Sequence, residues 1–583
     1  MITMGTLAKF SIKPQAAAVT AAARPASFWR LSAFASASAV LLWGSFFPLN
    51  CGVLAWFALV PLLVLVRAES SPRAIYGAAM AGGMIFALAA LKWMRVADPM
   101  MVFAWIALAF YVALYFPLAI WMLRRLDRLR LPLALTAPAV WVSLEYLRAH
   151  FLGGFAWYFL GYAQHDFLPM IQIADLGGAF AVSVLVAAVN GMLFELLSRL
   201  PAIRAWLGIS SNSPRRHMAL VGASITILLV ACSAGYGYWR LGQNDFAQGP
   251  RVTLIQTNIP QEVKNEKSDD NDDGTRARKR IMSELEQLSN LIKQERLNST
   301  LTVWPETTYP YDWLEIADDA PDGDLPEGFR QDCDVCRREC AAVASYYHSA
   351  VLLGMNTLRY GKLQDKDRFN SARFNSAVLI GKDGRERGRY DKIHCVPFGE
   401  YVPARETCPW MMHFSPYDHE YSLTPGTVQT RLLLPGENRD YRFGVLICYE
   451  DSDAVLARHL VCDTSDGPRV DFLVNISNDG WFKGTEEHEL HMAVCRFRAI
   501  ETRRAVVRAV NMGISGVFDG SGRCLIAAGP TWRESKKFAT VVSADLPLDT
   551  RSSFYALAGD WVAVACAVSC VGLLGVTAFR PRN

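Results

Sequence analysis

Residues 444–450 read Gly-Val-Leu-Ile-Cys-Tyr-Glu, an apolar run that ends on a cysteine and a polar pair. The run has the length and composition of a buried β-strand, and a helix is expected directly after it at 453–462. A cysteine at such a strand-to-helix turn is exposed, and helix N–H groups lie near its sulfur. The stretch therefore predicts an α/β fold with a candidate nucleophile, Cys448, at the end of a strand.

The same alternation extends on both sides of this stretch, from residue 250 to residue 547. Apolar runs typical of strands alternate with amphipathic runs typical of helices, which indicates sheets covered by helices. At roughly 300 residues, such a domain buries enough surface to fold as a unit. The expected strands are 252–256, 301–304, 350–355, 376–380, 443–448, 472–476, 505–510, 515–519 and 540–544, and the expected helices are 275–296, 330–348, 453–462 and 486–503.

The rest of the 583-residue chain is unusually apolar. The whole sequence is 52% hydrophobic and only 20% charged, which favours insertion into a membrane. Apolar runs of about 17 to 25 residues are long enough to cross a bilayer as a helix. Such runs predict a polytopic α-helical membrane domain of about seven helices at 31–240 and a C-terminal transmembrane helix at 558–579, about eight spans in all, near 31–48, 51–67, 74–93, 101–123, 131–148, 168–197, 218–239 and 558–579.

The distribution of lysine and arginine predicts which way the spans face. If the N-terminal segment 1–30 is cytoplasmic, the outside loops of the membrane domain hold few basic residues, namely Lys92, Arg95 and Arg148. This alternation is the one that the positive-inside rule requires, so the α/β domain at 250–547 is expected outside the cytoplasm. That domain is acidic on balance, which excludes nucleic acid as a partner. The inside segments hold many more basic residues, among them Lys9, Lys13, Arg24, Arg30, Arg67, Arg73, Arg124, Arg125, Arg128 and Arg130.

Three segments of the α/β domain concentrate reactive residues at predicted strand ends. Glu306 follows a strand in Trp-Pro-Glu-Thr, and Lys392 opens a long polar loop that runs to Pro403. Cys448 ends the strand quoted above. A cysteine thiol is mostly protonated near neutral pH, so a carboxylate base and an ammonium group nearby are what it needs to become a nucleophile.

Glu306, Lys392 and Cys448, in this order, resemble the Glu-Lys-Cys triad of the nitrilase (carbon-nitrogen hydrolase) superfamily, which implies an αββα sandwich. Three longer motifs resemble those of one membrane-embedded branch of the superfamily, the apolipoprotein N-acyltransferases. In that branch a nitrilase-like domain lies outside the cytoplasmic membrane, between several N-terminal spans and one C-terminal span. These motifs are Val396-Pro-Phe-Gly-Glu-Tyr-Val-Pro403, Cys448-Tyr-Glu450 and Ser477-Asn-Asp-Gly-Trp-Phe482.

The resemblance implies an acyl transfer in two steps. Glu306 takes the thiol proton of Cys448, which attacks the sn-1 ester of a membrane phospholipid, while Lys392 and the backbone N–H after Cys448 stabilise the oxyanion. The α-amine of a lipoprotein's diacylglyceryl-cysteine then attacks the thioester, which gives ping-pong kinetics. The expected partners are therefore a phospholipid, a diacylglyceryl-apolipoprotein and the bilayer of the bacterial inner membrane, and the expected enzyme is a monomer without metal or cofactor.

Further residues match the family's motifs. Glu400 is expected to hold Lys392 and the substrate amine, and Tyr449 and Glu450 are expected to orient the nucleophile loop. Asn478, Trp481 and Phe482 either line the pocket or shape its turn.

At several positions the chain also departs from the family's usual sequence. Asn265 follows Lys264 where tryptophan is common, and Ala156 and Ala505 stand where proline is frequent. A segment containing Cys333, Cys336 and Cys340 is unfamiliar, and these cysteines either pair or remain free thiols. His488 and His491 lie three apart on an expected helix, but the sequence suggests no third ligand for zinc.

Two other functions remain open at this point. A membrane-tethered amidase or nitrilase would keep the same chemistry and release ammonia or an amine from small amides, without phospholipid. A transporter or receptor with an inactive outer domain would carry polar groups within its spans and would tolerate changes at Cys448.

Overall fold

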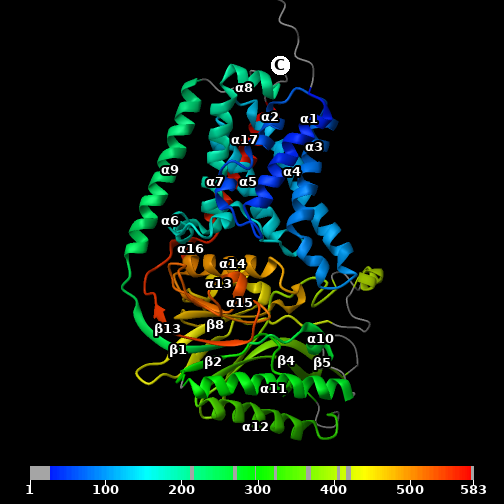
Figure 1. Cartoon of the computed structure of the whole chain (residues 1–583), viewed down its shortest axis with the longest axis vertical. Helices are drawn as coiled ribbons and strands as arrows, with labels where there is room; N and C mark the ends of the chain where they lie inside the picture. Colours follow the sequence, from blue (N-terminus) through cyan, green and yellow to red (C-terminus); the bar gives the residue numbers. More distant parts are fainter. Residues whose placement is uncertain are drawn as a thin grey trace, which may run out of the picture.

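The computed structural model describes residues 26–209, 216–266, 272–295, 297–318, 320, 325–362, 369–402, 407–414, 422–465 and 467–579. Of the expected cytoplasmic segment 1–30, all but residues 26–30 lies outside the described residues, as does Pro403 of the loop after Lys392. Figure 1 shows a bundle of helices stacked on an α/β domain, with the longest helices of the bundle running along the long axis of the molecule.

The bundle is built from two parts of the chain that lie far apart in sequence. Five of its helices, α3, α4, α7, α9 and α17, are long and apolar enough to cross a membrane. The expected spans at 31–48 and 131–148 correspond to α1 and α5, and the one at 51–67 corresponds to a 3-10 turn followed by the short α2. The number of spans therefore stays a prediction. The bounds are α1 Phe28–Gly44, η1 Gly52–Trp56, α2 Val60–Arg67, α3 Pro72–Ala90, η2 Lys92–Val96, α4 Met101–Asp127, α5 Leu133–His150, η3 Phe151–Gly153, η4 Leu160–Gln164, α6 Leu168–Ile171, α7 Ala174–Ser198, α8 Pro201–Leu207, α9 Arg216–Gly242 and α17 Trp561–Phe579.

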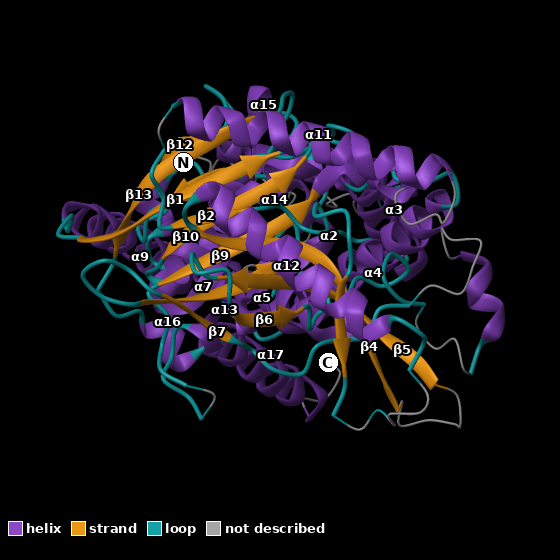
Figure 2. Cartoon of the chain, turned by 90° about the horizontal axis from the view of Figure 1, so that it is seen from below, coloured by secondary structure: helices purple, strands orange, loops and turns teal. Residues whose placement is uncertain are grey.

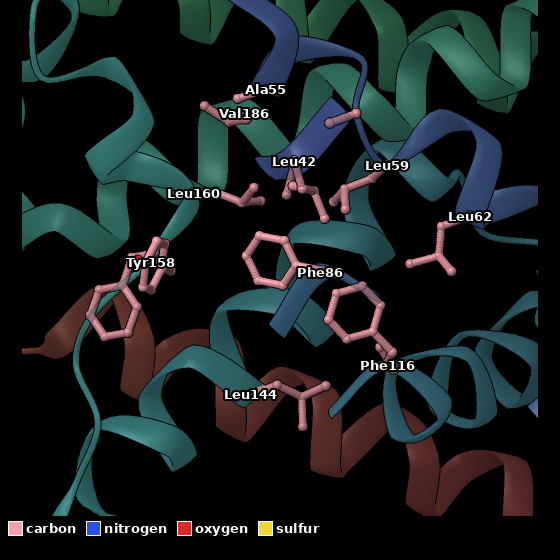
Figure 3. Packing of buried hydrophobic residues seen from close by; sticks show 14 of the residues in the cluster. Leu42, Ala55, Leu59, Leu62, Phe86, Phe116, Leu144, Tyr158, Leu160 and Val186 are labelled. Atoms are coloured by element: carbon pink, nitrogen blue, oxygen red, sulfur yellow. The ribbon is translucent and has the colours of Figure 1, made fainter. Parts of the chain in front are cut away.

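Small residues and large apolar side chains alternate where the bundle helices meet. Phe86, Phe116 and Leu144 are buried at the centre, where Figure 3 shows them facing one another. Gly191 on α7 allows close approach, since a Cβ there would lie 2.3 Å from the carbonyl oxygen of Leu133. Helix α7 is interrupted at Gly178, whose φ of +67° is a conformation that glycine adopts without strain.

Two sheets form the centre of the α/β domain, and Figure 2 shows their strands from below, with α11 and α12 on the viewer's side. The first sheet has the order β13-β1-β2-β4-β5-β6, with β3 beside β4, and the second has the order β12-β11-β10-β9-β8-β7. β1, β2 and β4 are parallel neighbours in the first sheet, as are β8, β9 and β10 in the second. The bounds are β1 Ala247–Gln256, β2 Leu301–Val303, β3 Trp313–Ile316, β4 Ala350–Lys362, β5 Phe369–Ile380, β6 Glu386–Asp391, β7 Arg431–Leu434, β8 Tyr441–Ile447, β9 Phe472–Asn478, β10 Ala505–Asn511, β11 Gly516–Phe518, β12 Cys524–Ala527 and β13 Thr540–Leu548.

Three separate cores show that the domain has the layers helix, sheet, sheet, helix. One core lies between the two sheets, and another packs the first sheet against α11 and α12. A third packs the second sheet against α13 and α14. The predicted α/β fold is thus confirmed. The helices are α10 Gln261–Glu266, α11 Asp272–Gln294, α12 Phe329–Tyr347, η5 Pro409–Phe414, η6 Cys448–Ser452, α13 Ala454–Leu460, η7 Asp479–Phe482, α14 Glu487–Thr502, α15 Trp532–Ser535 and α16 Phe554–Ala558.

All nine expected strands and all four expected helices of this domain are present, but the sequence did not predict β3, β6, β7 and β12. These four lie at the margins of the sheets. Edge strands bury one side less completely and so carry a weaker apolar pattern, as the charged sequence of β6, Glu-Arg-Gly-Arg-Tyr-Asp, illustrates.

Helix α14 joins the two halves of the molecule, and every one of its 16 residues is buried. Met492, Cys495 and Ala499 face the second sheet, whereas Val494 and Phe497 pack into the core of the bundle. Figure 1 shows α14 directly beneath the bundle helices. The candidate nucleophile therefore lies in a domain whose inner helix is also a part of the bundle core.

Candidate active site

The three residues of the predicted triad follow strands of the two facing sheets. Glu306 lies just beyond β2, Lys392 directly follows β6, and Cys448 directly follows β8. The Lys392 ammonium lies 3.6 Å from Glu306 Oε1, and its charge acts on the Cys448 thiol. The structure thus brings the three groups into one site.

Lys392 is the buried cation of this site, with only 1% of its side chain exposed. Its Nζ lies 2.9 Å from both carboxylate oxygens of Glu400. Burial lowers the pKa of Lys392, but the acidic groups beside it, Glu400 first, outweigh burial and hold the pKa well above its ordinary value. The Lys392 side chain is therefore a charged ammonium at neutral pH.

Asn375 on β5 is a site residue that the sequence did not reveal. Its Nδ2 donates to Glu306 Oε1 at 2.6 Å and to Glu400 Oε1 at 3.1 Å. Lys264 also reaches this place, since its Nζ donates to the backbone carbonyl of Glu306 at 2.9 Å. The one available signal was a polar residue, Asn375, just before the apolar run of an expected strand.

Cys448 has a strained backbone and a weakly acidic thiol. Its φ is +53°, in the left-handed region that disfavours residues with a side chain. Burial and the charge of Glu306 raise the pKa of the thiol to about 12, while Lys392 and His491 act in the opposite direction. The resting nucleophile is therefore a thiol, and a base must accept its proton when it reacts.

Glu450 ties the nucleophile loop to the loop that follows Lys392. Its Oε1 accepts hydrogen bonds from the Tyr390 hydroxyl and from the N–H groups of Ile393 and His394, at 2.8, 2.7 and 3.0 Å. Its Oε2 accepts from the N–H of Ile447 at 2.7 Å. Burial raises the pKa of this carboxyl to about 7, although its N–H donors act to lower it.

Aromatic side chains of the bundle cover the site from the bundle side. The ring of Trp157 stacks at 6.2 Å on Tyr449, the residue after the nucleophile. Trp93 meets Phe482 edge to face at 4.8 Å. Trp481 is half-buried on the same turn as Phe482, within η7. The predicted residues Tyr449 and Phe482 thus lie where the two halves of the molecule meet.

Asn478 lies at the end of β9, away from these aromatic contacts. Its Nδ2 donates to Gln261 Oε1 at 2.8 Å, and its Oδ1 accepts from Asn511 Nδ2 at 2.8 Å. Of the two roles expected for Asn478, these bonds favour shaping of the turn.

A cavity of about 960 Å³ lies between the bundle and the α/β domain. Tyr449, Ile393 and Cys395 line it from the α/β side, and Phe159 and Phe180 line it from the bundle. Its wall therefore includes the neighbours of both Cys448 and Lys392. A cavity of this size accommodates a ligand far larger than a small amide.

Comparison with known proteins places this geometry in a family. Residues 38–192 match the protein family described as "Apolipoprotein N-acyltransferase N-terminal domain", and residues 251–555 match the family described as "Carbon-nitrogen hydrolase". The apolipoprotein N-acyltransferase of Geobacter metallireducens is 30% identical over 554 residues, which cover 94% of this chain and 95% of that protein. The chain belongs to the apolipoprotein N-acyltransferase family.

A second curated relative also matches over nearly the whole chain, and solved structures match over about half of it. The apolipoprotein N-acyltransferase of Rhodopirellula baltica is 28% identical over 581 residues, covering 91% of this chain and 94% of that protein. Among solved structures, a carbon-nitrogen hydrolase from Helicobacter pylori matches with a TM-score of 0.34 and 15% identity, over 54% of this chain and 94% of that one.

Two departures from the usual wording of the apolipoprotein N-acyltransferase family now have a structural description. Asn265 Oδ1 accepts a hydrogen bond from Gln261 Nε2 at 2.8 Å, so it extends the bonds that hold Asn478. Cys336 and Cys340 belong to the core between α12 and the first sheet. All thirteen cysteines lie in the described part of the chain, and none of them forms a disulfide there.

The histidines of α14 have surroundings that the sequence did not show. Asp479 and Glu487 lie close enough to His491 to complete a possible metal-ligand group. A cation already occupies this neighbourhood, however, because Arg508 Nη2 lies 2.8 Å from Asp479 Oδ2. His488 accepts a hydrogen bond from the N–H of Gly484 at 3.3 Å. The group is thus a buried ion-pair network.

Proposed function

We propose that this chain transfers a fatty acyl group from a membrane phospholipid to the α-amine of the N-terminal diacylglyceryl-cysteine of apolipoproteins. The observation that carries the proposal is the thiol of Cys448 beside Glu306 and Lys392, next to a cavity walled by apolar bundle helices. A hydrolase of small amides needs neither the cavity nor the bundle. Membership in the family supports the same reaction.

The first half-reaction forms an acyl-enzyme. As Cys448 attacks the sn-1 ester carbonyl of the phospholipid, Glu306 accepts the thiol proton and a C–S bond forms. Lys392 and the N–H of Tyr449 stabilise the oxyanion, and one such donor is typically worth about 3 to 4 kcal/mol of barrier. The C–O bond then breaks, and Glu306 returns the proton to the leaving oxygen of the lysophospholipid.

The second half-reaction transfers the acyl group to nitrogen. The neutral α-amine of the acceptor attacks the thioester, Glu306 accepts a proton from the nitrogen, and the C–N bond forms as the C–S bond breaks. Cys448 leaves as a thiolate and regains its proton from Glu306. One covalent intermediate and two sequential substrates give ping-pong kinetics, without a metal or cofactor.

Glu400 and Asn375 support both steps in this scheme. Glu400 fixes the Lys392 ammonium at 2.9 Å, which leaves the longer 3.6 Å contact to Glu306. The amide of Asn375 bridges the two carboxylates and offsets their mutual repulsion. The base Glu306 is thereby held in place while the ammonium remains available to an oxyanion.

The substrates fix where this enzyme works. Both the donor's acyl chains and the acceptor's diacylglyceryl group reside in a bilayer, and five helices of the bundle have the length and composition to cross one. We place the α/β domain, residues 250–547, on the periplasmic side of the bacterial inner membrane. About seven spans at 31–240 and one at 558–579 anchor it as a monomer, following the bias of basic residues toward the inside.

Mass spectrometry of the purified full-length protein tests this proposal. After incubation with phospholipid, a fatty-acyl mass increment is expected on Cys448 and absent from Cys448→Ala, while the matched control Cys524→Ala still acquires it. Addition of a diacylglyceryl-cysteine peptide should move the increment to the peptide amine. A wild-type protein that never acquires the increment, or loses it only to water, would refute the transferase and favour the tethered amidase.

A further inference from the structure

Two buried side chains outside the triad converge on the backbone carbonyl of the nucleophile. Asn475 Nδ2 lies 3.2 Å from the carbonyl oxygen of Cys448, and His491 Nε2 lies 3.3 Å from the same atom. Asn475 is on β9 and His491 is on α14, so the contacts come from two different elements. The scheme of acyl transfer given above uses neither residue.

We propose that Asn475 and His491 are positioning residues that fix the peptide plane between Cys448 and Tyr449. In a planar trans peptide the C=O of one residue and the N–H of the next point in opposite directions. Donors that hold the Cys448 carbonyl on one side therefore aim the Tyr449 N–H toward the other side. That N–H is the proposed backbone donor to the oxyanion, so this inference rests on the proposed function.

The backbone at Cys448 is itself in a strained conformation. At a φ of +53°, the residue lies in a region that costs free energy for a residue with a Cβ. Strained backbone persists only where surrounding contacts determine it. Rotation of the Cys448–Tyr449 peptide plane changes ψ of Cys448 and φ of Tyr449, and it would turn the Tyr449 N–H away from the oxyanion. Two hydrogen bonds to the carbonyl oppose that rotation.

A guanidinium fixes the orientation of Asn475. Arg508 Nη1 donates to Asn475 Oδ1, which leaves Nδ2 to donate to the carbonyls of Leu446 and Cys448, at 3.1 and 3.2 Å. Asn475 and Arg508 are both fully buried. The reversed amide would place its NH2 group against the guanidinium, so this orientation alone satisfies both neighbours.

Carboxylates from three elements surround His491 and favour its charged form. Its Nε2 lies 2.9 Å from Asp451 Oδ1, and its Nδ1 lies 3.3 Å from Asp479 Oδ1 and 3.5 Å from Glu487 Oε1. Burial and Arg508 lower the pKa of His491, but Asp451 and Asp479 outweigh them and hold it well above its ordinary value. Both ring nitrogens thus carry hydrogen, and the single Nε2 hydrogen is shared between Asp451 Oδ1 at 2.9 Å and the Cys448 carbonyl at 3.3 Å.

The guanidinium of Arg508 connects Asn475 with the carboxylates around His491. Arg508 Nη1 lies 3.2 Å from Asp451 Oδ2 and Nη2 lies 2.8 Å from Asp479 Oδ2, so one guanidinium holds the carboxylates that hold His491. The thiol of Cys495 also donates to Asp451 Oδ2, at 2.9 Å. Trp157 covers the imidazole ring at 5.7 Å. The donors to Cys448 are therefore parts of one rigid, buried assembly.

The test compares variants that separate hydrogen bonding from charge. Asn475→Asp removes the donor to Cys448 and keeps an acceptor for Arg508, whereas His491→Gln keeps an N–H donor and removes the positive charge. His491→Leu removes both, and exposed Asn298→Asp is the matched control. For each full-length protein, the rate of acyl-enzyme formation from phospholipid and the rate of Cys448 alkylation by iodoacetamide are measured, together with the thermal unfolding temperature.

Alkylation needs the thiol but no oxyanion donor, so the two rates should separate. Asn475→Asp and His491→Leu are expected to slow acyl-enzyme formation by about 100-fold, as for loss of an oxyanion donor or a small misplacement. Their alkylation is expected to slow far less, and His491→Gln is expected to keep most of the acylation rate. Because His491→Gln and His491→Leu form a second pair, the test does not depend on the folding of Asn475→Asp.

Three outcomes would overturn the inference. Acylation at the wild-type rate in Asn475→Asp would show that the carbonyl needs no donor. Equal losses of acylation and alkylation would show an effect on the thiol itself. A loss in His491→Gln as large as in His491→Leu would assign the effect to charge. Failure of the wild-type protein to form an acyl-enzyme would instead overturn the proposed function, and it would be seen before any variant is measured.

Discussion

Replacement of Glu450 by glutamine tests how the nucleophile loop and the lysine loop are held together. The Glu450 carboxylate accepts four hydrogen bonds, three from residues 390–394 and one from Ile447. Glutamine has nearly the same shape, so the packing around it is kept. Its amide, however, offers one acceptor oxygen and one NH2 group where the carboxylate offers two acceptors.

The magnitude follows from that difference. In Glu450→Gln, Oε1 keeps the three donors of the lysine loop, while Nε2 faces the Ile447 N–H and leaves it without its partner. An unsatisfied buried donor costs about 1 to 3 kcal/mol, and bonds to a neutral oxygen are about half as strong as bonds to a carboxylate. The loss of the buried charge offsets part of this, so the free energy of unfolding should fall by about 2 kcal/mol.

The acyl-enzyme assay then decides whether this contact matters for the reaction. Separation of Lys392 from Cys448 by even about 1 Å should slow acylation on the order of 100-fold. The rate of thioester formation and the unfolding temperature are measured for Glu450→Gln and for Glu286→Gln on the exposed face of α11. An unchanged acylation rate and an unchanged unfolding temperature in Glu450→Gln would refute the reasoning.

Three further predictions concern charge and backbone. Asn375→Asp places a third carboxylate beside Glu306 and Glu400, so acylation should fall by at least tenfold near neutral pH and recover partly in acid, in contrast to Asn290→Asp. Because the pKa of Glu450 is raised to about 7, protonation below that pH removes acceptors, and the acylation rate of the wild type should decline there. The contribution of Glu450 to the free energy of unfolding has the opposite pH dependence. It is fully present below about pH 4 and is lost as the pH rises through 7, which unfolding measured as a function of pH will check. Gly178→Ala should cost about 1 to 3 kcal/mol of stability, since φ is +67° and a Cβ would lie 2.7 Å from Tyr555, whereas Gly572→Ala on α17 should cost nothing in unfolding experiments.

The ends of strands were the part of the site that the sequence could predict. Glu306 and Cys448 each follow an apolar run that predicts a strand, whereas β6, which precedes Lys392, was not predicted. The three strands belong to two facing sheets, so the resemblance to the Glu-Lys-Cys triad was needed to group the three residues. The strands at the sheet margins were missed because a strand such as β6 is half exposed and its pattern is polar.

The residues that support the triad required the structure. Asn375 meets Glu306 across 69 positions of sequence, and His491 meets Cys448 across 43. No sequence pattern marked Asn375, and the spacing of His491 from His488 pointed only to a metal site. Their roles come from pairings between sheets and helices, and a single sequence carries no signal of such pairings.

The burial of α14 on all sides also has a consequence for the order in which the parts of the protein fold. The ribosome delivers the bundle helices up to α9 first, then the whole α/β domain, and α17 last. Once α14 has been made, its Val494 and Phe497 are covered by the bundle that is already in place. The last step of folding therefore depends on the bundle helices, and the α/β domain expressed without them should expose this face and aggregate.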